Sequence, residues 1–161
     1  MKKVLAEAAE RVKDQYGGDV GKRRPELATP ALVLDVVSDA HAAGPGHHWR
    51  VDLPAAAVQV TGDESRLHQV LANLLANGRT HTPGGTLVTV GLRVVGDDAV
   101  LTVTDDGPGI PEPLRSHVFE RFARGDASRS RHAGSTGLGL AIVRRIVELH
   151  GGGVGAASAG P

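Results

Sequence analysis

Apolar residues recur at helical spacing in three stretches of the chain. One covers residues 31–42, a second opens after Asp63, its expected N-cap, and runs to about His81, and a third covers residues 137–150. Apolar positions three and four residues apart lie on one face of a helix. The sequence therefore predicts three helices, each with an apolar face that packs against another element.

Alternating and β-branched residues predict strands between these helices. Short strands are expected over residues 49–53 and 57–61, and longer ones over residues 87–95 and 99–104, with a last strand over residues 151–158. A Gly-Asp-Asp turn joins the two longer strands and predicts a hairpin. The pattern predicts an α/β two-layer sandwich, with a mixed, mostly antiparallel sheet and helices packed on one face.

The first 29 residues differ from the rest in composition. All four lysines lie in the first 22 residues, together with the only methionine and the only tyrosine. Apolar spacing predicts a helix over residues 1–16, and residues 19–29 are typical of a linker. Residues 1–29 are thus expected to be a fragment of a preceding helical domain or an appended tag, and residues 30–161 to be the main domain.

Composition and charge exclude several classes of protein. The chain has 161 residues, 18 basic and 18 acidic, so no net charge favours nucleic acid or a membrane surface. It contains no cysteine, which excludes disulfides and thiolate metal sites. No apolar run reaches the ~20 residues that span a bilayer. The expected partners therefore include neither nucleic acid nor, for this segment, the membrane.

The predicted helix after Asp63 carries two asparagines on a polar arc opposite its leucines. Asn73 and Asn77 lie four residues apart, although asparagine is a poor helix former. An amide oxygen is a hard ligand that suits Mg²⁺. The alternative is a solvated polar face on which asparagine and glutamine bond to each other.

Two glycine-containing segments carry the remaining candidate chemistry. Asp105 ends a predicted strand, where a carboxylate can accept a hydrogen bond from the amine of adenine, and Gly107 and Gly109 allow close approach of the base. The alternative is an ordinary Asp-Gly turn. Residues 134–140 precede the third helix, whose amide groups form an anion site, unless the loop merely caps the helix. This loop is neither a P-loop nor a Rossmann turn.

The three motifs resemble, in order, the N, G1 and G2 boxes of the GHKL nucleotide-binding superfamily. They are Asn73-Leu-Leu-Ala-Asn77, Asp105-Asp-Gly-Pro-Gly-Ile110 and Gly134-Ser-Thr-Gly-Leu-Gly-Leu140. The closer resemblance, over roughly residues 30–158, is to the catalytic ATP-binding domain of bacterial sensor histidine kinases. It implies a Bergerat-type fold, Mg-ATP as ligand, and a mobile ATP lid over residues 123–136. Val118-Phe-Glu-Arg-Phe122 matches the family's F box, and its aromatic side chains are expected to anchor that lid to the core.

The resemblance also assigns roles to residues. It makes Asn73, Asn77 and Arg124 catalytic, gives Asn77 the Mg²⁺, and assigns the adenine contact to Asp105 rather than Asp106. Hydrolytic relatives carry a water-activating Glu at the position of Asn73, so this chain favours phosphotransfer over hydrolysis. The implied nucleotide-binding residues are Asn73, Asn77, His81, Asp105, Gly107, Gly109, Ile110, Arg124, Thr136, Gly137, Leu138, Gly139 and Leu140.

The resemblance implies partners that this chain lacks. No histidine has the sequence context of a phosphoacceptor helix, and the C-terminus lacks the Gly-Thr-x-Phe strand usual in the family, so an excised or truncated piece is expected. The implied partners are a dimerisation and phosphoacceptor helical domain and a downstream response regulator. The implied location is the cytoplasmic part of a membrane-bound sensor. The alternatives are a non-catalytic ATP-responsive module and a hydrolytic GHKL ATPase.

Overall fold

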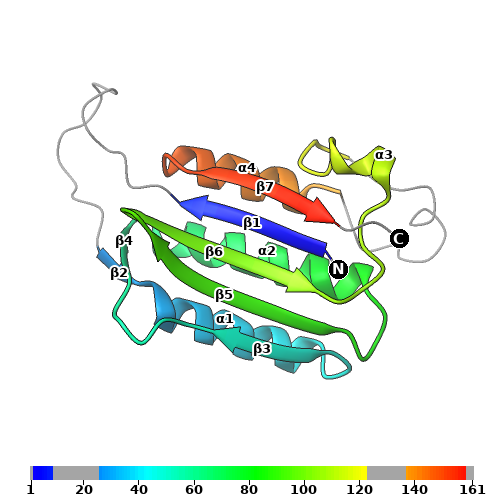
Figure 1. Ribbon diagram of the computed structural model, residues 1–161, viewed down its shortest axis with the longest axis horizontal. Coiled ribbons are helices and arrows are strands. Elements are labelled where there is room, and N and C mark those ends of the chain that lie inside the picture. The colour runs from blue at the N-terminus through cyan, green and yellow to red at the C-terminus, as the bar shows by residue number, and fades with distance from the viewer. Residues whose placement is uncertain (1, 9–25, 123–136, 159–161) are drawn as a thin grey trace.

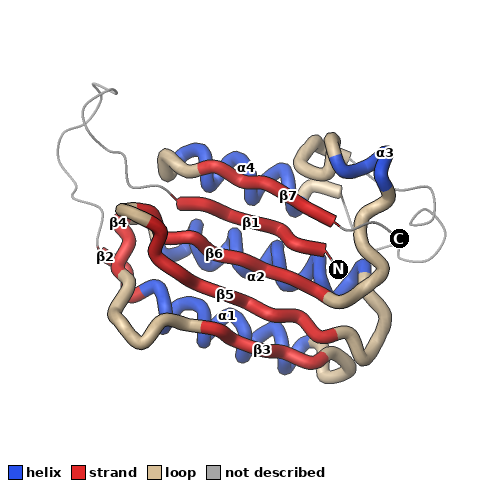
Figure 2. The backbone as a smooth tube through the Cα atoms, in the orientation of Figure 1, coloured by secondary structure: helices blue, strands red, loops and turns tan. Residues whose placement is uncertain are grey.

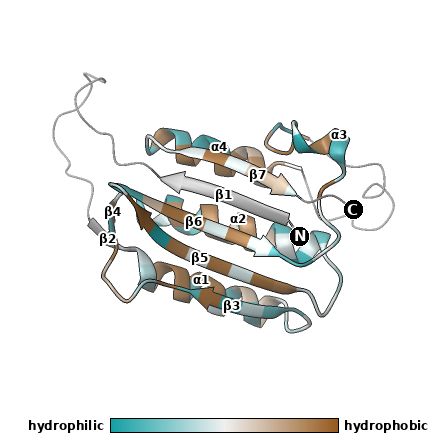
Figure 3. Ribbon diagram, in the orientation of Figure 1, coloured by the Kyte–Doolittle hydropathy of each residue, from teal (hydrophilic) through white to brown (hydrophobic). Residues whose placement is uncertain are grey.

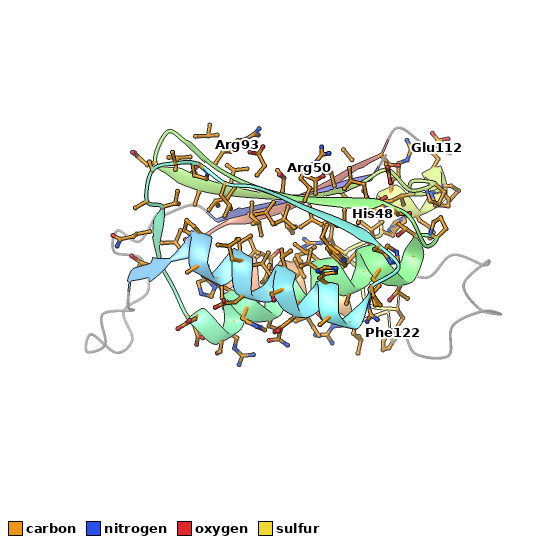
Figure 4. The ribbon with its side chains drawn as sticks, turned by 90° about the horizontal axis from the view of Figure 1, so that it is seen from below. His48, Arg50, Arg93, Glu112 and Phe122 are labelled. Atoms are coloured by element: carbon orange, nitrogen blue, oxygen red, sulfur yellow. The ribbon has the colours of Figure 1, made fainter. Side chains whose placement is uncertain are left out.

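The computed structural model describes residues 2–8, 26–122 and 137–158 of the chain. Its elements form two layers, a sheet and a set of helices that cover one face of that sheet (Figure 1). Seen from the side, Arg50 and Arg93 point away from the helices, on the sheet's other face (Figure 4). The expected α/β two-layer sandwich is confirmed.

The main sheet has five strands in the order β3-β5-β6-β1-β7 (Figure 2). Strands β3 and β5 pair in parallel, and the other pairs are antiparallel. The sheet is therefore mixed and mostly antiparallel, as expected. Its strands are β1 Lys2–Ala8, β3 His48–Asp52, β5 Leu87–Val95, β6 Asp98–Asp105 and β7 Gly153–Ser158.

Three long helices form the second layer. They are α1 Thr29–Ala43, α2 Glu64–His81 and α4 Gly139–Leu149. A single helical turn, α3 Glu112–Arg115, follows the end of β6, and a two-stranded sheet joins β2 Glu26–Ala28 to β4 Gln59–Thr61. None of the helices in the described part of the chain is long and apolar enough to cross a membrane.

The core lies between the two layers. Hydrophobic residues recur along the strands and helices that enclose it (Figure 3). Residues alternate along β5, so that every second side chain is buried against the helices. Burying these side chains supplies the main driving force for folding, at about 25 cal/mol per Å² of apolar surface. The most deeply buried are Val33 and Val36 of α1, Leu74 and Leu75 of α2, Val88 and Val90 of β5, Val100 of β6, and Val143 of α4.

The N-terminal helix expected over residues 1–16 is wrong where the structure describes it. Lys2–Ala8 is a strand that pairs with β6 on one side and β7 on the other, with Val4 opposite both Val103 and Ala156. In the described part of the chain, β7 joins the sheet only through β1. Backbone pairing along two neighbouring strands outweighs a weak local helix preference.

The linker expected over residues 19–29 is also partly corrected. Glu26–Ala28 forms β2, which pairs with Gln59–Thr61, and Thr29 begins α1. Residues 9–25 lie outside the described residues. Both described segments of the N-terminal 29 residues therefore pair with strands from later in the chain.

Candidate functional site

Helix α2 forms one wall of the candidate site. It begins after Asp63, whose carboxylate Oδ1 accepts a hydrogen bond from the Arg66 amide at 3.1 Å, as the sequence predicted for its N-cap. Leu74 and Leu75 are buried in the core, while Asn73 and Asn77 are half-buried. The apolar face thus fixes the helix on the sheet and leaves the two amides on a separate side.

The Asn73 side chain meets the start of α4. A Cβ added at Gly139, the first residue of that helix, would lie 3.7 Å from Asn73 Oδ1. Among the described residues, the buried Asn73 Nδ2 has no hydrogen-bond partner. A buried donor without an acceptor is destabilising by about 1–3 kcal/mol. An anionic ligand that reached both the N-terminus of α4 and this Nδ2 would supply that acceptor, so the N–H groups here suit a phosphate group.

The turn after β6 is the second part of the candidate site. Asp105 ends β6 two residues beyond the core residue Val103, and it is 5% exposed. Its carboxylate Oδ1 accepts a hydrogen bond from the Gly107 amide at 3.1 Å. The adjacent Asp106 is exposed and accepts from the Leu87 amide at 2.8 Å, which ties the turn to the start of β5. The two carboxylates therefore differ in burial and partners.

The rest of this turn is held by residues that the sequence did not single out. The amide of the buried Ile110 donates to Ser158 Oγ at 2.9 Å, and Arg115 Nε donates to the Ile110 carbonyl at 3.1 Å. Gly109 has a φ of 87°, a conformation that favours glycine. Ser158 and Arg115 are 48 and 5 residues away from Ile110, and no local motif marks the Ser158 contact.

The F-box expectation is half correct. Phe119 packs against the core, whereas the Phe122 side chain is 69% exposed (Figure 4). Phe122 adopts a φ of 63°, and its amide donates to the Gly137 carbonyl at 3.0 Å. The Phe122 side chain therefore does not anchor to the core as expected, and its backbone instead joins Phe122 to Gly137, the next described residue of the chain.

The other candidate residues lie in several places. His81 is exposed at the last position of α2. Gly137 has a φ of 67°, Leu138 precedes the first turn of α4, and Leu140 packs against the core. Arg124, Thr136 and the expected lid over residues 123–136 lie outside the described residues.

Arg79, in the last turn of α2, contacts α1. Its Nη1 donates to the Ala43 carbonyl at 3.0 Å, at the C-terminus of α1. Its side chain also lies over Gly44, where an added Cβ would be 2.5 Å from Arg79 Cδ. This side chain therefore joins α2 to α1.

The described residues contain no group of three or more histidine and acidic side chains that could hold a metal ion. Mg²⁺ differs from most transition metals, because it is commonly held by one or two protein oxygens together with phosphate oxygens and water. The half-buried Asn77 amide, one helical turn from Asn73, fits that coordination.

Comparison with known proteins places the chain in a family. A family model described as histidine kinase-, DNA gyrase B- and HSP90-like ATPase matches residues 62–160. The chain belongs to this family.

Two similar relatives are named as sensor histidine kinases. The chain is 61% identical over 121 residues to a probable sensor histidine kinase, TcrY, and 47% identical over 138 residues to the sensor histidine kinase TrcS, both from Mycobacterium tuberculosis. These alignments cover 75% and 83% of this chain, but 26% and 27% of the relatives. The chain thus spans about a quarter of the length of these curated relatives.

Solved structures agree with the fold. The mycobacterial sensor histidine kinase MprB superposes with a TM-score of 0.70 at 33% identity, covering 79% of this chain and 82% of that one. The catalytic domain of the histidine kinase ThkA superposes with a TM-score of 0.68 at 24% identity, covering 78% of this chain and 80% of that one. Within its family, the chain has the fold of the catalytic domains of sensor histidine kinases.

Proposed function

We propose that this chain binds Mg-ATP and transfers the γ-phosphoryl group to a histidine on a separate helical domain, in two-component signalling. One observation carries the proposal. The side-chain amide of Asn73 lies with its Oδ1 nearest the first residue of α4, and its buried Nδ2 has no partner within the described part of the chain, so a polar side chain with a free donor lies beside the positive end of a helix dipole. The names of the relatives, sensor histidine kinases, support the acceptor that we propose.

The proposed chemistry is one displacement at phosphorus. The imidazole nitrogen of the acceptor forms a bond to the γ-phosphorus, the bond to the β,γ-bridging oxygen breaks, and ADP leaves with that electron pair. Mg²⁺, when bound through Asn77, would neutralise charge on the phosphate oxygens. Asn73 and the amides of α4 hold the phosphates, and Asp105 orients the base. An amide at position 73 cannot take a proton from water, which disfavours hydrolysis.

The finer parts of this proposal concern location and partners. A reaction that consumes ATP belongs on the cytoplasmic side of a sensor, where we place this segment. We infer a dimerisation and phosphoacceptor domain and a response regulator as partners, because the relatives are sensor kinases about four times as long as the aligned region.

The first test is the Asn77→Ala variant in titration calorimetry with Mg-ATP. It removes the amide oxygen that we assign to Mg²⁺, and affinity should fall about tenfold or more, as for loss of one charge-assisted contact. Gln69→Ala is the matched control, because Gln69 is half-buried on the same polar arc two turns earlier and bonds to Arg66. Unchanged Mg-ATP affinity in folded Asn77→Ala would contradict the metal assignment.

The second test separates transfer from the two alternatives. With γ-labelled ATP, the chain alone should neither hydrolyse ATP appreciably nor label itself. Addition of the helical domain of the parent kinase should yield an acid-labile, alkali-stable label on that domain, as expected for phosphohistidine. Robust hydrolysis by the chain alone would favour a GHKL ATPase. Tight binding without transfer would favour an ATP-responsive module.

A further inference from the structure

The end of α2 and the turn after β6 meet at a single threonine. Thr82 is the first residue after α2, with extended backbone at φ −124° and ψ 153°. It lies between Gly78, which is in the last turn of α2, and Gly107, which follows Asp105. We propose that Thr82 is a positioning residue, which sets the place of the Asp105 turn relative to the α2 amides and is itself held by His47. This inference rests on the proposed function.

The hydroxyl of Thr82 fixes the threonine to α2. Thr82 Oγ1 donates to the Gly78 carbonyl at 2.7 Å, and His47 Nε2 lies 3.1 Å from the same oxygen. A hydroxyl has one hydrogen, and here that hydrogen goes to Gly78. His47 Nε2 must therefore donate to Thr82. The threonine is thus oriented from two sides, by the helix that it ends and by a residue outside the site.

The loop that carries His47 is itself well held. The Gly85 amide donates to the Gly46 carbonyl at 2.6 Å, and the His48 amide donates to the Thr86 carbonyl at 2.9 Å. The His47 ring lies 6.3 Å from the ring of Trp49, centroid to centroid. The loop after α1 and the loop after α2 are therefore joined by backbone hydrogen bonds on both sides of His47.

The methyl group of Thr82 fixes the turn after β6. A Cβ added at Gly107 would lie 2.7 Å from Thr82 Cγ2, 3.0 Å from Asp105 Oδ1 and 3.1 Å from Thr82 Cβ, so the Thr82 methyl group is the nearest obstacle. Gly107 is not among the glycines with positive φ, so space and not backbone conformation requires glycine here. The Gly107 amide in turn donates to Asp105 Oδ1 at 3.1 Å. Contact therefore runs from the Thr82 methyl group through Gly107 to the carboxylate proposed to bind adenine.

This geometry gives Gly107 a purpose different from the one inferred from sequence. Glycine at this position was expected to let the base approach closely. In the structure, the Thr82 methyl group occupies the space that a side chain at position 107 would need. The two explanations differ in one consequence: only the second allows a change at Thr82 to relieve a side chain at position 107.

The test is a double-mutant cycle on Mg-ATP affinity with Gly107→Ala, Thr82→Ser and the double variant. Serine keeps the hydroxyl and removes the methyl group that the new Cβ would meet. Gly107→Ala in the native background should weaken binding about tenfold, within the range of overpacking. In the Thr82→Ser background the same change should cost at least about threefold less. An equal loss in both backgrounds overturns the proposal.

Two controls make the cycle specific. Gly109→Ala is strained by its φ of 87°, so Thr82→Ser should not relieve it. His47→Gln keeps a side-chain donor and should bind like the native protein, whereas His47→Ala should resemble Thr82→Ser. The ratio of ATP to GTP affinity should fall in Thr82→Ser, because the turn that reads the base loses its support. General loss of packing would lower both affinities equally.

Failure of the proposed function has a separate signature. A native protein that does not bind Mg-ATP contradicts that function but leaves the positioning contact measurable. The amide resonances of Asp105 and Gly107 in a nitrogen–proton correlation spectrum should shift in Thr82→Ser and stay in place in Gln69→Ala. Unshifted Asp105 and Gly107 resonances in folded Thr82→Ser overturn the positioning role in either case.

Discussion

The two ends of helix α2 are held in different ways. At its start, Asp63 Oδ1 accepts from the Ser65 hydroxyl at 2.6 Å and from the Arg66 amide, and the Asp63 amide donates to His150 Nε2 at 3.1 Å. His150 Nδ1 lies 2.8 Å from the Ile146 carbonyl and donates to it. The start of α2 is thereby linked to the end of α4 through donors and acceptors that are paired with each other.

The second half of α2 depends more on contacts with other elements. Asn73 has a buried amide nitrogen without a partner among the described residues, Gly78 is a weak helix former, and Thr82 divides its contacts between His47 and the Asp105 turn. The first end contributes to folding, and we propose that the second half is arranged for a ligand. Substitutions at the first end should change stability, and substitutions near the second should change binding.

The largest effect should come from the binding side, in Asp105→Asn. Asparagine keeps an oxygen that can accept from the Gly107 amide, but it loses the charge proposed to face the adenine amine. ATP affinity should fall by about 1.5–3 kcal/mol, the range for a charge-assisted hydrogen bond. Titration calorimetry of the folded variant measures it.

Asp106→Asn is the control for this change. Asp106 is exposed, and asparagine can still accept from the Leu87 amide, so affinity should remain close to native. Competition by nucleotides gives an independent check. If unlabelled GTP and unlabelled ATP displaced labelled ATP from the native protein equally well, Asp105 would not distinguish adenine from guanine.

At the other end of α2, His150→Ala should lower stability and leave binding intact. It removes two hydrogen bonds, and His150 also packs on Gly62, where an added Cβ would lie 3.1 Å from the ring. The free energy of unfolding should fall by about 1–2 kcal/mol, because each bond contributes a modest net amount. Urea denaturation gives the stability, and calorimetry at a temperature where the variant is folded gives the affinity. A tenfold loss of Mg-ATP affinity in the folded variant would remove the contrast between the two ends.

The same contrast explains which parts of the fold and of the candidate site could be predicted from the sequence. The bounds of α2 and its Asp63 cap follow from residues within one or two turns of each other, and both predictions are confirmed. The expected nucleotide-binding glycines and asparagines also form short local motifs. Roles for Asn73, Asn77 and Asp105 stay predictions, but the structure does bring Asn73 and the start of α4 together.

The largest errors and omissions involve distant residues, whereas the missed contact of Arg115 with Ile110 spans only 5 residues. Lys2–Ala8 pairs with strands about 100 and 150 residues later, and nothing within the segment specifies a strand. Contacts of Thr82 with His47 and of Ile110 with Ser158 span 35 and 48 residues. Hydrophobic periodicity reports which face a helix buries, but not which element it meets.

A smaller effect is expected at Gly78, a weak helix former in α2 with space for a larger side chain. Gly78 is buried, and an added Cβ would lie 3.7 and 3.8 Å from the methyl groups of Val88, an ordinary packing distance. Gly78→Ala should therefore stabilise the protein by up to about 1 kcal/mol through helix propensity. Thermal and urea unfolding measure this gain, and Mg-ATP affinity should not change.

Gly91→Ala is the contrasting glycine substitution. A Cβ at Gly91 would lie 2.6 Å from Thr102 Oγ1, across the β5–β6 pair. This variant should be destabilised. Comparing Gly78→Ala with Gly91→Ala therefore tests whether the space around the added Cβ decides the sign of the change in unfolding free energy. A destabilised Gly78→Ala would show that the second half of α2 requires glycine for another reason.

The smallest effect is the pH response of the first end of α2. The Ser65 hydroxyl and the Arg66 amide donate to the Asp63 carboxylate and lower the pKa of Asp63 below its ordinary value. A carboxyl group with a lowered pKa in the folded state stabilises the protein above its unfolded pKa, which is about 3.9. That contribution is lost as pH falls from about 4 through the lower folded pKa.

Asp63→Asn isolates this contribution, because asparagine caps a helix about as well as aspartate and does not ionise. The free energy of unfolding should fall less steeply in the variant than in the native protein between about pH 5 and pH 3. Asp63 is fully exposed, so the difference should be small and should shrink with added salt. Parallel pH dependence in the two proteins would mean that the cap acts through hydrogen bonding alone. Mg-ATP affinity should not distinguish the two proteins near neutral pH, because the Asp63 cap lies at the end of α2 away from the candidate site.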